Sequence, residues 1–389
     1  MIVNRRMTNN ILLLCLLANI LSCCTDSSQI TTQPPKPTLA NPTSNVTPTK
    51  TIEPTNGTSA KETPDDQQLI DFDFPILFSF KYYEYDTSDI LGRSQIYDLD
   101  LSGVIHGQLP RYSDNLIHYT DPAWSPDCQN IAFTMFYRNE QEESYEVQGI
   151  MNLETQEIFE FSTSNRLNHS PSWSNDGERI VFTALGDGIS QIYIYDVDTE
   201  SITQLTNLGF NYDPDWSPTN GQIVFVSENE DMASIHIINA DGSGQREIVP
   251  GAWGSGSFND PKIDSPYSPR WSPDGMMIAF QVREEALQRP VTKIYIADAN
   301  GSNPRRLVEG DRREDDPDST GYFIQWESDP VWSPDGKEIL FTRAYLPTNE
   351  VQLCYANVET GTFRCPVSFM DISVQGLDWC HSNQEMLDE

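Results

Sequence analysis

The chain contains 389 residues, with 24 Lys and Arg against 58 Asp and Glu and a formal net charge of −34. Sequence-independent binding to nucleic acid or to anionic lipid headgroups depends on basic patches, so this charge balance argues against both roles. Cationic partners and divalent metal ions stay open as ligand classes.

Residues 1–22 have the pattern of an export signal. A basic start is followed by an apolar run at 11–20, which is too short to span a bilayer and fits the hydrophobic part of a signal peptide. The run ends at Ser22-Cys23-Cys24, which resembles a bacterial lipoprotein signal, in which the Cys after a small residue is lipidated. We expect Cys23 to carry the lipid, with Cys24 second. An ordinary signal peptide is the alternative.

Residues 23–68 are expected to form a disordered stalk. They are rich in Thr, Pro, Ser and Asn and contain almost no large apolar residues. Such a segment cannot bury enough surface to offset the entropy of ordering it, and proline keeps it extended. The sequence therefore predicts a domain at 69–389, tethered to a bacterial membrane by an N-terminal lipid and facing the periplasm or the cell exterior.

A repeated motif organises residues 69–389. Residues 329–341 read Asp-Pro-Val-Trp-Ser-Pro-Asp-Gly-Lys-Glu-Ile-Leu-Phe. Ser-Pro-Asp-Gly favours a tight turn, because Pro presets φ and Gly accepts a positive φ. The apolar strand after this turn is followed by a second hairpin with period-two alternation, so each repeat predicts four antiparallel strands, as in a propeller blade. The tryptophans that mark the copies are Trp124, Trp173, Trp216, Trp271, Trp332 and, in a degenerate copy, Trp379.

The blade count follows from how the Trp motifs and the second hairpins alternate. The first hairpin, at 94–110, has no Trp motif before it, and Trp379 has no hairpin after it. Both irregularities disappear if the Trp379 strand completes the first blade beside the strand at 75–80. We therefore predict an all-β, six-bladed propeller of four-stranded antiparallel blades, closed by pairing N- and C-terminal strands. A seventh blade would need another repeat, and the sequence contains none.

The repeat resembles that of a known family. Trp-Ser-Pro-Asp-Gly, then Ile-Ala-Phe at 278–280, then the Ile-Tyr hairpin at 293–301 is similar to the TolB-type six-bladed propeller repeat, over roughly residues 70–387. TolB has an additional N-terminal α/β domain, whose place is taken here by the signal and the stalk. The resemblance therefore implies the fold rather than TolB's own partner.

Four cysteines of residues 69–389 permit two disulfides in an exported protein, with three alternative pairings. Cys354 and Cys365 flank the turn at 358–361, and Cys128 and Cys380 lie beside the first and last Trp motifs. Ring closure would make those two motifs neighbours. We favour Cys354–Cys365 together with Cys128–Cys380.

The residues just before each Trp are candidates for a binding site at one mouth of the channel. Asp121, Asp213 and Asp329 occupy the same place in three blades, so they predict a ring of carboxylates with two imidazoles nearby. Hard oxygen ligands suit Ca²⁺ or Mn²⁺. The competing interpretation is structural and needs no cofactor, because Asp or Ser before Pro commonly caps a turn. The candidates are His118, Asp121, His169, Asn211, Asp213 and Asp329.

Two insertions interrupt the repeat. Residues 250–269 carry Trp253, Phe258 and Tyr267, which predict either an aromatic binding surface or the cover of a blade edge. The acidic insertion at 309–321 lacks the alternating ligands of a Ca²⁺ loop and is interpreted as a solvated loop.

The expected function is non-enzymatic binding of a protein, peptide or glycan at the cell envelope, with no nucleic-acid partner. The chain contains no Gly-x-Ser-x-Gly elbow, which argues against a serine hydrolase. The alternative is a metal-dependent, carbohydrate-active propeller of the lyase or lactonase type.

Overall fold

The computed structural model describes residues 76–82, 93–99, 105–110, 117–138, 144–163, 167–229, 232–251, 262–286, 289–308, 324–346, 350–370 and 372–381. The signal, Cys23, the stalk, Trp253, Phe258 and the acidic insertion lie outside these residues. Within them every assigned element is a strand. The described part of the chain includes no helix with the length and apolar character needed to cross a membrane.

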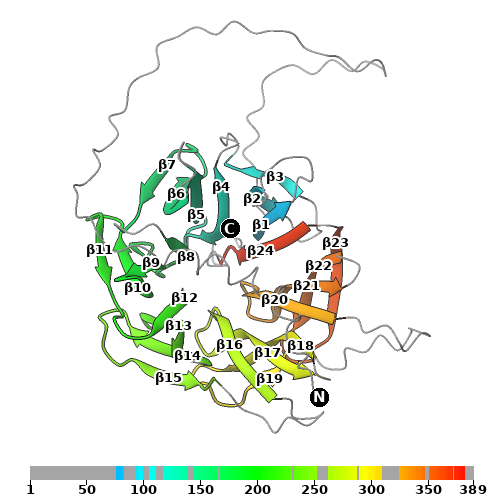
Figure 1. The fold of residues 1–389 in the computed structure, drawn as a ribbon. Coiled ribbons are helices and arrows are strands. Elements are labelled where there is room, and N and C mark those ends of the chain that lie inside the picture. The colour runs from blue at the N-terminus through cyan, green and yellow to red at the C-terminus, as the bar shows by residue number, and fades with distance from the viewer. Residues whose placement is uncertain are drawn as a thin grey trace, which may run out of the picture. The chain divides into compact units, whose positions relative to one another are not determined.

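Twenty-four strands form six four-stranded antiparallel blades that follow one another around a ring (Figure 1). Each blade is given from its innermost strand outward. Blade 1 contains β24 (Ile372–Trp379), β1 (Ile76–Tyr82), β2 (Arg93–Leu99) and β3 (Ile105–Leu109). Blade 2 contains β4 (His118–Trp124), β5 (Asn130–Arg138), β6 (Ser144–Asn152) and β7 (Ile158–Phe161). Blade 3 contains β8 (Asn168–Trp173), β9 (Arg179–Gly186), β10 (Ile189–Asp196) and β11 (Ser201–Gln204).

The remaining three blades have the same order. Blade 4 contains β12 (Phe210–Trp216), β13 (Gln222–Asn229), β14 (Met232–Asn239) and β15 (Arg246–Val249). Blade 5 contains β16 (Lys262–Trp271), β17 (Met277–Ala286), β18 (Arg289–Asp298) and β19 (Arg305–Arg306). Blade 6 contains β20 (Ile324–Trp332), β21 (Glu338–Leu346), β22 (Glu350–Asn357) and β23 (Phe363–Met370). A parallel bridge between Thr292 and Trp326 joins blades 5 and 6 into one sheet.

Blade 1 combines strands from both ends of the described chain. β24 pairs antiparallel with β1, which places Ile76 opposite Trp379 and Leu77 opposite Asp378. The first and last repeats are therefore held together by backbone hydrogen bonds.

Every innermost strand contains a bulge at the residue three positions before its Trp. In five blades that residue is Asp or Ser in the left-handed region, with φ between 48° and 53°, and in blade 1 it is Gly376 with φ 57°. Asp adopts this region more readily than most residues, and the Pro that follows fits a bulge because it donates no ladder hydrogen bond. The Asp-Pro and Ser-Pro pairs are therefore explained by backbone geometry. The five residues are Asp121, Ser170, Asp213, Ser268 and Asp329.

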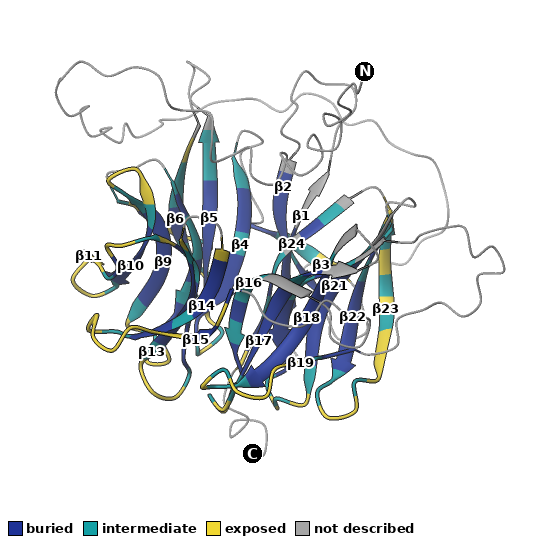
Figure 2. Ribbon diagram, turned by 60° about the horizontal axis from the view of Figure 1, so that its bottom comes forward, coloured by how far each residue is buried: buried dark blue, intermediate teal, exposed yellow. Residues whose placement is uncertain are grey.

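Ser-Pro-Asp-Gly turns, or variants of them, join the two innermost strands of blades 2 to 6. In blade 6 the Ser333 hydroxyl donates to Asp335 at 2.7 Å and accepts from the backbone N–H of Glu338 at 2.9 Å. The N–H of Gly336 donates to the Ser333 carbonyl at 2.9 Å. We call the end of the ring that carries these turns the turn face, and the opposite end, where the innermost strands begin, the entry face. Figure 2 shows many exposed turns at the lower end of the strands.

The hydrophobic core lies between the blades. Apolar residues of the second strands, such as Ile278 and Phe280, are fully buried and pack against Val224 and Ile235 of the preceding blade. The Trp of every innermost strand is also buried in these interfaces. The repeated Trp is therefore a packing residue.

Two disulfides are present. Cys128 joins Cys380, which links the turn of blade 2 to the end of β24. Cys128 takes the place of the turn glycine and has a φ of 56°. Cys354 joins Cys365 across β22 and β23.

Candidate functional site

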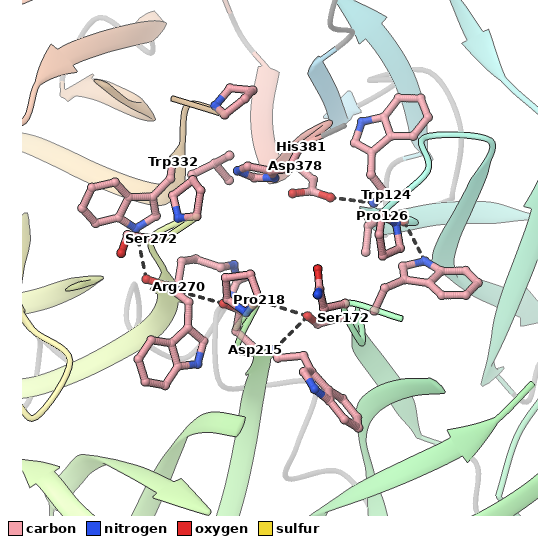
Figure 3. Close-up of a pocket in the computed structure, with 18 of the residues that line it drawn as sticks. Trp124, Pro126, Ser172, Asp215, Pro218, Arg270, Ser272, Trp332, Asp378 and His381 are labelled. Atoms are coloured by element: carbon pink, nitrogen blue, oxygen red, sulfur yellow. Dashed lines mark hydrogen bonds between the residues drawn. The ribbon is translucent and has the colours of Figure 1, made fainter. Parts of the chain in front are cut away.

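A cavity of about 640 Å³ opens at the turn-face mouth of the channel, and all six blades contribute to its wall (Figure 3). Its wall is formed by the ends of the innermost strands and by the turns that follow them. Each blade contributes the equivalent repeat positions to the cavity wall. The chemical character of the cavity is therefore determined by those positions at which the residue type differs between blades.

The residue directly before each Trp is the most variable of these positions. It is charged in three blades: Asp215 in blade 4, Arg270 in blade 5 and Asp378 in blade 1. Blades 1 and 4 are opposite each other in a six-membered ring, and Figure 3 shows Asp378 across the cavity from Asp215 and Arg270. The six residues at this position are Ala123, Ser172, Asp215, Arg270, Val331 and Asp378.

The two carboxylates also connect neighbouring blades. Asp378 accepts a hydrogen bond from the backbone N–H of Trp124 at 2.6 Å. Asp215 accepts one from the backbone N–H of Trp271 at 2.7 Å and another from the Ser172 hydroxyl at 3.0 Å. Each carboxylate therefore fixes the start of the next blade's turn while facing the cavity.

Burial raises the pKa of both carboxyl groups. For Asp378 it raises the pKa to about 7, against the opposing effects of the Trp124 and Trp379 N–H groups and of Arg270. For Asp215 burial raises the pKa, and Arg270 is the largest opposing influence. Arg270 therefore lies close enough to stabilise the ionised form of both aspartates.

The Arg270 guanidinium is engaged at one nitrogen. Its Nη1 donates to the carbonyl of the adjacent Pro269 at 2.9 Å. Among the residues that the structure describes, no carboxylate forms an ion pair with it within 4.0 Å. The remaining N–H groups of Arg270 are therefore free to meet a ligand in the cavity.

A second set of charges lies deeper in the channel, which we call the aspartate ring: Asp121, Asp213 and Asp329. They come from the same bulge position of blades 2, 4 and 6, and their charges act on one another: Asp213 contributes to raising the pKa of Asp121, and both contribute to raising that of Asp329. Asp213 accepts hydrogen bonds from Ser170 and Ser268 of the two flanking blades, at 3.2 Å each.

Burial also dominates the electrostatics of the aspartate ring. It raises the pKa of Asp329 to about 6, with Arg270 opposing and the other two ring aspartates reinforcing the shift. The pKa of Asp121 is raised by burial, while His169 opposes the shift. The channel therefore holds several carboxyl groups that keep protons more readily than exposed ones.

Residues 109–265 match the family model described as the TolB beta propeller domain. The chain carries a TolB-like β-propeller. Solved structures with the same fold include TolB from Acinetobacter baumannii, at 18% identity and a TM-score of 0.59, which covers 80% of this chain and 67% of that one.

Two other solved structures resemble the TolB-like propeller. A putative TolB from Agrobacterium tumefaciens has 13% identity and a TM-score of 0.52, and the match covers 79% of this chain and 98% of that one. A chain of a nidogen/laminin complex has 11% identity and a TM-score of 0.55, and the match covers 80% of this chain and 100% of that one. These identities show the fold alone. No curated protein sequence matches this chain.

The TolB-like propeller places the candidates from the sequence in two different environments. Asp121, Asp213 and Asp329 come together in the aspartate ring, and the His169 ring contacts the Ser170 hydroxyl at 3.1 Å beside it. His118 instead accepts a hydrogen bond from the backbone N–H of Ser94 in blade 1, at 3.1 Å.

Asn211 is fully buried and holds a connection between blades. Its amide donates to Gln191 of blade 3 at 3.0 Å and to the carbonyl of Leu208 at 2.7 Å. Like His118, Asn211 forms a hydrogen bond to the neighbouring blade. These two side chains therefore contribute to contacts between blades rather than to the aspartate ring.

The aspartate ring does not form a compact ligand set. The described residues of the propeller contain no group of three or more His, Cys, Asp or Glu side chains arranged to hold a metal ion. The hydroxyls of Ser170 and Ser268 lie between the ring carboxylates and satisfy Asp213. A Ca²⁺ or Mn²⁺ site at this level stays a prediction.

Tyr267, which the sequence predicts in an aromatic loop, belongs instead to strand β16. The repeat pattern becomes recognisable only at Ser268, but bulges let β16 pair with β17 from Lys262 onward. The Tyr267 hydroxyl contacts that of Thr292 at 3.2 Å, and the side chain is half-buried. It therefore joins β16 to β18.

The sequence did not single out the three charged residues that directly precede a Trp at the cavity, Asp215, Arg270 and Asp378. The residue before each Trp was interpreted as part of a structural motif. The sequence signal that could have identified these residues is the variation between repeats. The position directly before the Trp is Ala or Val in two blades but Asp or Arg in three others. Packing alone does not account for an Asp or an Arg at such a position.

Proposed function

We propose that the protein is a non-enzymatic binding protein of the bacterial cell envelope, which takes part of its partner into the turn-face cavity. The observation that carries this is the cavity itself. Its volume of about 640 Å³ falls within the range of roughly 300–1,000 Å³ that is usual for ligand pockets. Its two channel carboxylates are each engaged by a backbone N–H group, which suits a rigid binding surface.

The proposed location rests on the cysteines. The two disulfides fit an oxidising compartment outside the cytoplasm. Lipidation of Cys23 would then hold the propeller at a membrane by the stalk at 23–68.

Retention of a partner from envelope extract tests the binding function, with the full chain purified in detergent and immobilised. We expect Asn175→Trp, which places a large side chain at the exposed rim of the cavity, to abolish retention. Glu247→Trp, on the exposed outer strand of blade 4, is the matched control and should retain the partner. A partner that binds both variants equally would place binding elsewhere.

A metal-dependent, carbohydrate-active enzyme is the second candidate, and the mutual interaction of the three ring aspartates favours it. Metal analysis of the purified protein separates the two functions. Stoichiometric Mn²⁺ or Ca²⁺ that is lost in Asp213→Ala would support the enzyme, whereas the binding function predicts no stoichiometric metal.

A further inference from the structure

We infer that the turn-face cavity recognises a zwitterion, with the carboxylate of a free amino acid or short peptide on Arg270 and its ammonium group between Asp378 and Asp215. This inference rests on the proposed binding function and names its ligand class. It is carried by the opposed charges that face one cavity from different blades.

The anionic half of the ligand follows from the hydrogen bonds of Arg270. The cavity wall contains no other Arg or Lys among the described residues. Arg270 uses one N–H for the Pro269 carbonyl and forms no ion pair within 4.0 Å with the described carboxylates. A guanidinium has five N–H donors in a planar fork that matches a carboxylate. The unused donors therefore favour a carboxylate ligand.

The cationic half follows from the aspartates. Asp378 and Asp215 bind backbone N–H groups, but each carboxylate oxygen has two lone pairs, so both keep acceptor capacity toward the cavity. A purely anionic ligand would be repelled by both carboxylates, and a purely cationic ligand would be repelled by Arg270. A molecule that carries both charges avoids both penalties, since its carboxylate can meet Arg270 while its ammonium group meets the aspartates.

The rest of the cavity wall suits a peptide better than a sugar. The indoles of Trp124, Trp216 and Trp271 contribute to the wall but are only 5–6% exposed, so they present no stacking face for a sugar ring. Proline rings of the turns, such as Pro126 and Pro218, line the cavity instead. These rings provide an apolar surface for the body of a short peptide.

A calorimetric titration of the full chain in detergent at pH 7 tests the inference. The probes are tetra-alanine, its N-acetylated form, its C-terminal amide and the doubly blocked form. Because a hydrogen bond to a charged group contributes roughly 1.5–3 kcal/mol, each block should weaken binding about tenfold or more. Alanine and dialanine, titrated in parallel, show whether the site takes a single amino acid or needs a longer peptide.

Two variants assign the charges. In Arg270→Gln, blocking the C-terminus should no longer weaken binding, while blocking the N-terminus still should. In Asp378→Asn, which keeps an acceptor for Trp124, sensitivity to N-acetylation should fall and sensitivity to amidation should persist. Arg246→Gln, on the exposed outer strand of blade 4, should match the unaltered protein.

Two results would overturn the inference: no binding of any alanine peptide, or equal binding of the free and doubly blocked forms. Equal binding that Asn175→Trp still abolishes would leave the cavity as a peptide site and remove only the zwitterion. Loss of the binding function itself would appear in the partner-retention experiment, which uses no alanine peptide.

Discussion

Asp378 accepts a hydrogen bond from the backbone N–H of Trp124 at 2.6 Å. One residue of the last strand thus fixes the innermost strand of blade 2 and also faces the turn-face cavity. The disulfide between Cys128 and Cys380 lies at the same junction. Ring closure and the proposed ligand site therefore share Asp378. Replacing this residue should have two effects, one on stability and one on ligand binding.

Removing the Asp378 acceptor should destabilise the propeller more than removing its charge. In Asp378→Ala the buried Trp124 N–H loses its acceptor, which typically costs about 1–3 kcal/mol. Asp378→Asn retains an amide oxygen and should cost less. Urea unfolding of both variants measures the difference, and an Asn variant as unstable as the Ala variant would show that the charge matters more than the hydrogen bond.

The stability of the propeller should fall as the pH rises from about 4 to about 8. The pKa of Asp378 is raised from 3.8 to about 7, that of Asp329 to about 6 and that of Glu146 to about 8, mainly by burial. A group whose pKa is raised on folding binds more protons in the folded state, so its contribution is present below the unfolded pKa and is lost as the pH rises through the folded pKa.

Unfolding free energies across this pH range check the sign. Asp378→Asn should flatten the slope between pH 5 and 7. Asp241→Asn is the control, because Asp241 is exposed and its pKa is lowered by hydrogen bonds from Ser243, so it titrates below this window. Stability that rises steadily toward pH 8 would contradict the assignment of raised pKa values.

Gly376→Ala should destabilise the junction between blades 1 and 2. Gly376 has a φ of 57°, and a Cβ built on it would lie 2.9 Å from the Cα of Asp121. Left-handed strain of about 1–2 kcal/mol is therefore joined by a backbone clash. Gly221→Ala is matched for strain, with a φ of 66° and no atom within 4 Å. If Gly376→Ala and Gly221→Ala lost equal amounts of unfolding free energy, the clash between the new Cβ and the Asp121 backbone would contribute nothing to the destabilisation.

The two disulfides should differ in their contribution to stability. Cys128–Cys380 spans 252 residues and Cys354–Cys365 spans 11. Constraint of the unfolded chain predicts roughly 5 kcal/mol for the first and about 3 kcal/mol for the second. Denaturant unfolding of the two Cys→Ser double variants compares them, and a larger loss on removing Cys354–Cys365 would contradict the loop-length argument.

The repeat made the architecture predictable from the sequence. Asp-Pro-x-Trp and Ser-Pro-Asp-Gly encode a bulge and a turn, which are local backbone features, so one reading applies to every copy. The same regularity identified Asp121, Asp213 and Asp329 as equivalent positions, and the structure brings them together in the channel.

The site at the turn face was less predictable, because it depends on single residues that break the repeat. Asp215, Arg270 and Asp378 share one position but no residue type, so no motif marks them. Their importance appears only when blades that are far apart in sequence lie opposite each other. His118 and Asn211 were candidates by position alone, and their partners, Ser94 and Gln191, belong to neighbouring blades.

Hydrogen–deuterium exchange of the full chain, with and without saturating tetra-alanine, locates the ligand on the propeller. We expect slower exchange at the turn face, in residues 272–277 of blade 5 and 379–381 of blade 1, and no change in the entry-face turn at 186–189 of blade 3. Protection confined to the entry face, or no protection anywhere, would contradict the proposal that the turn-face cavity is the ligand site.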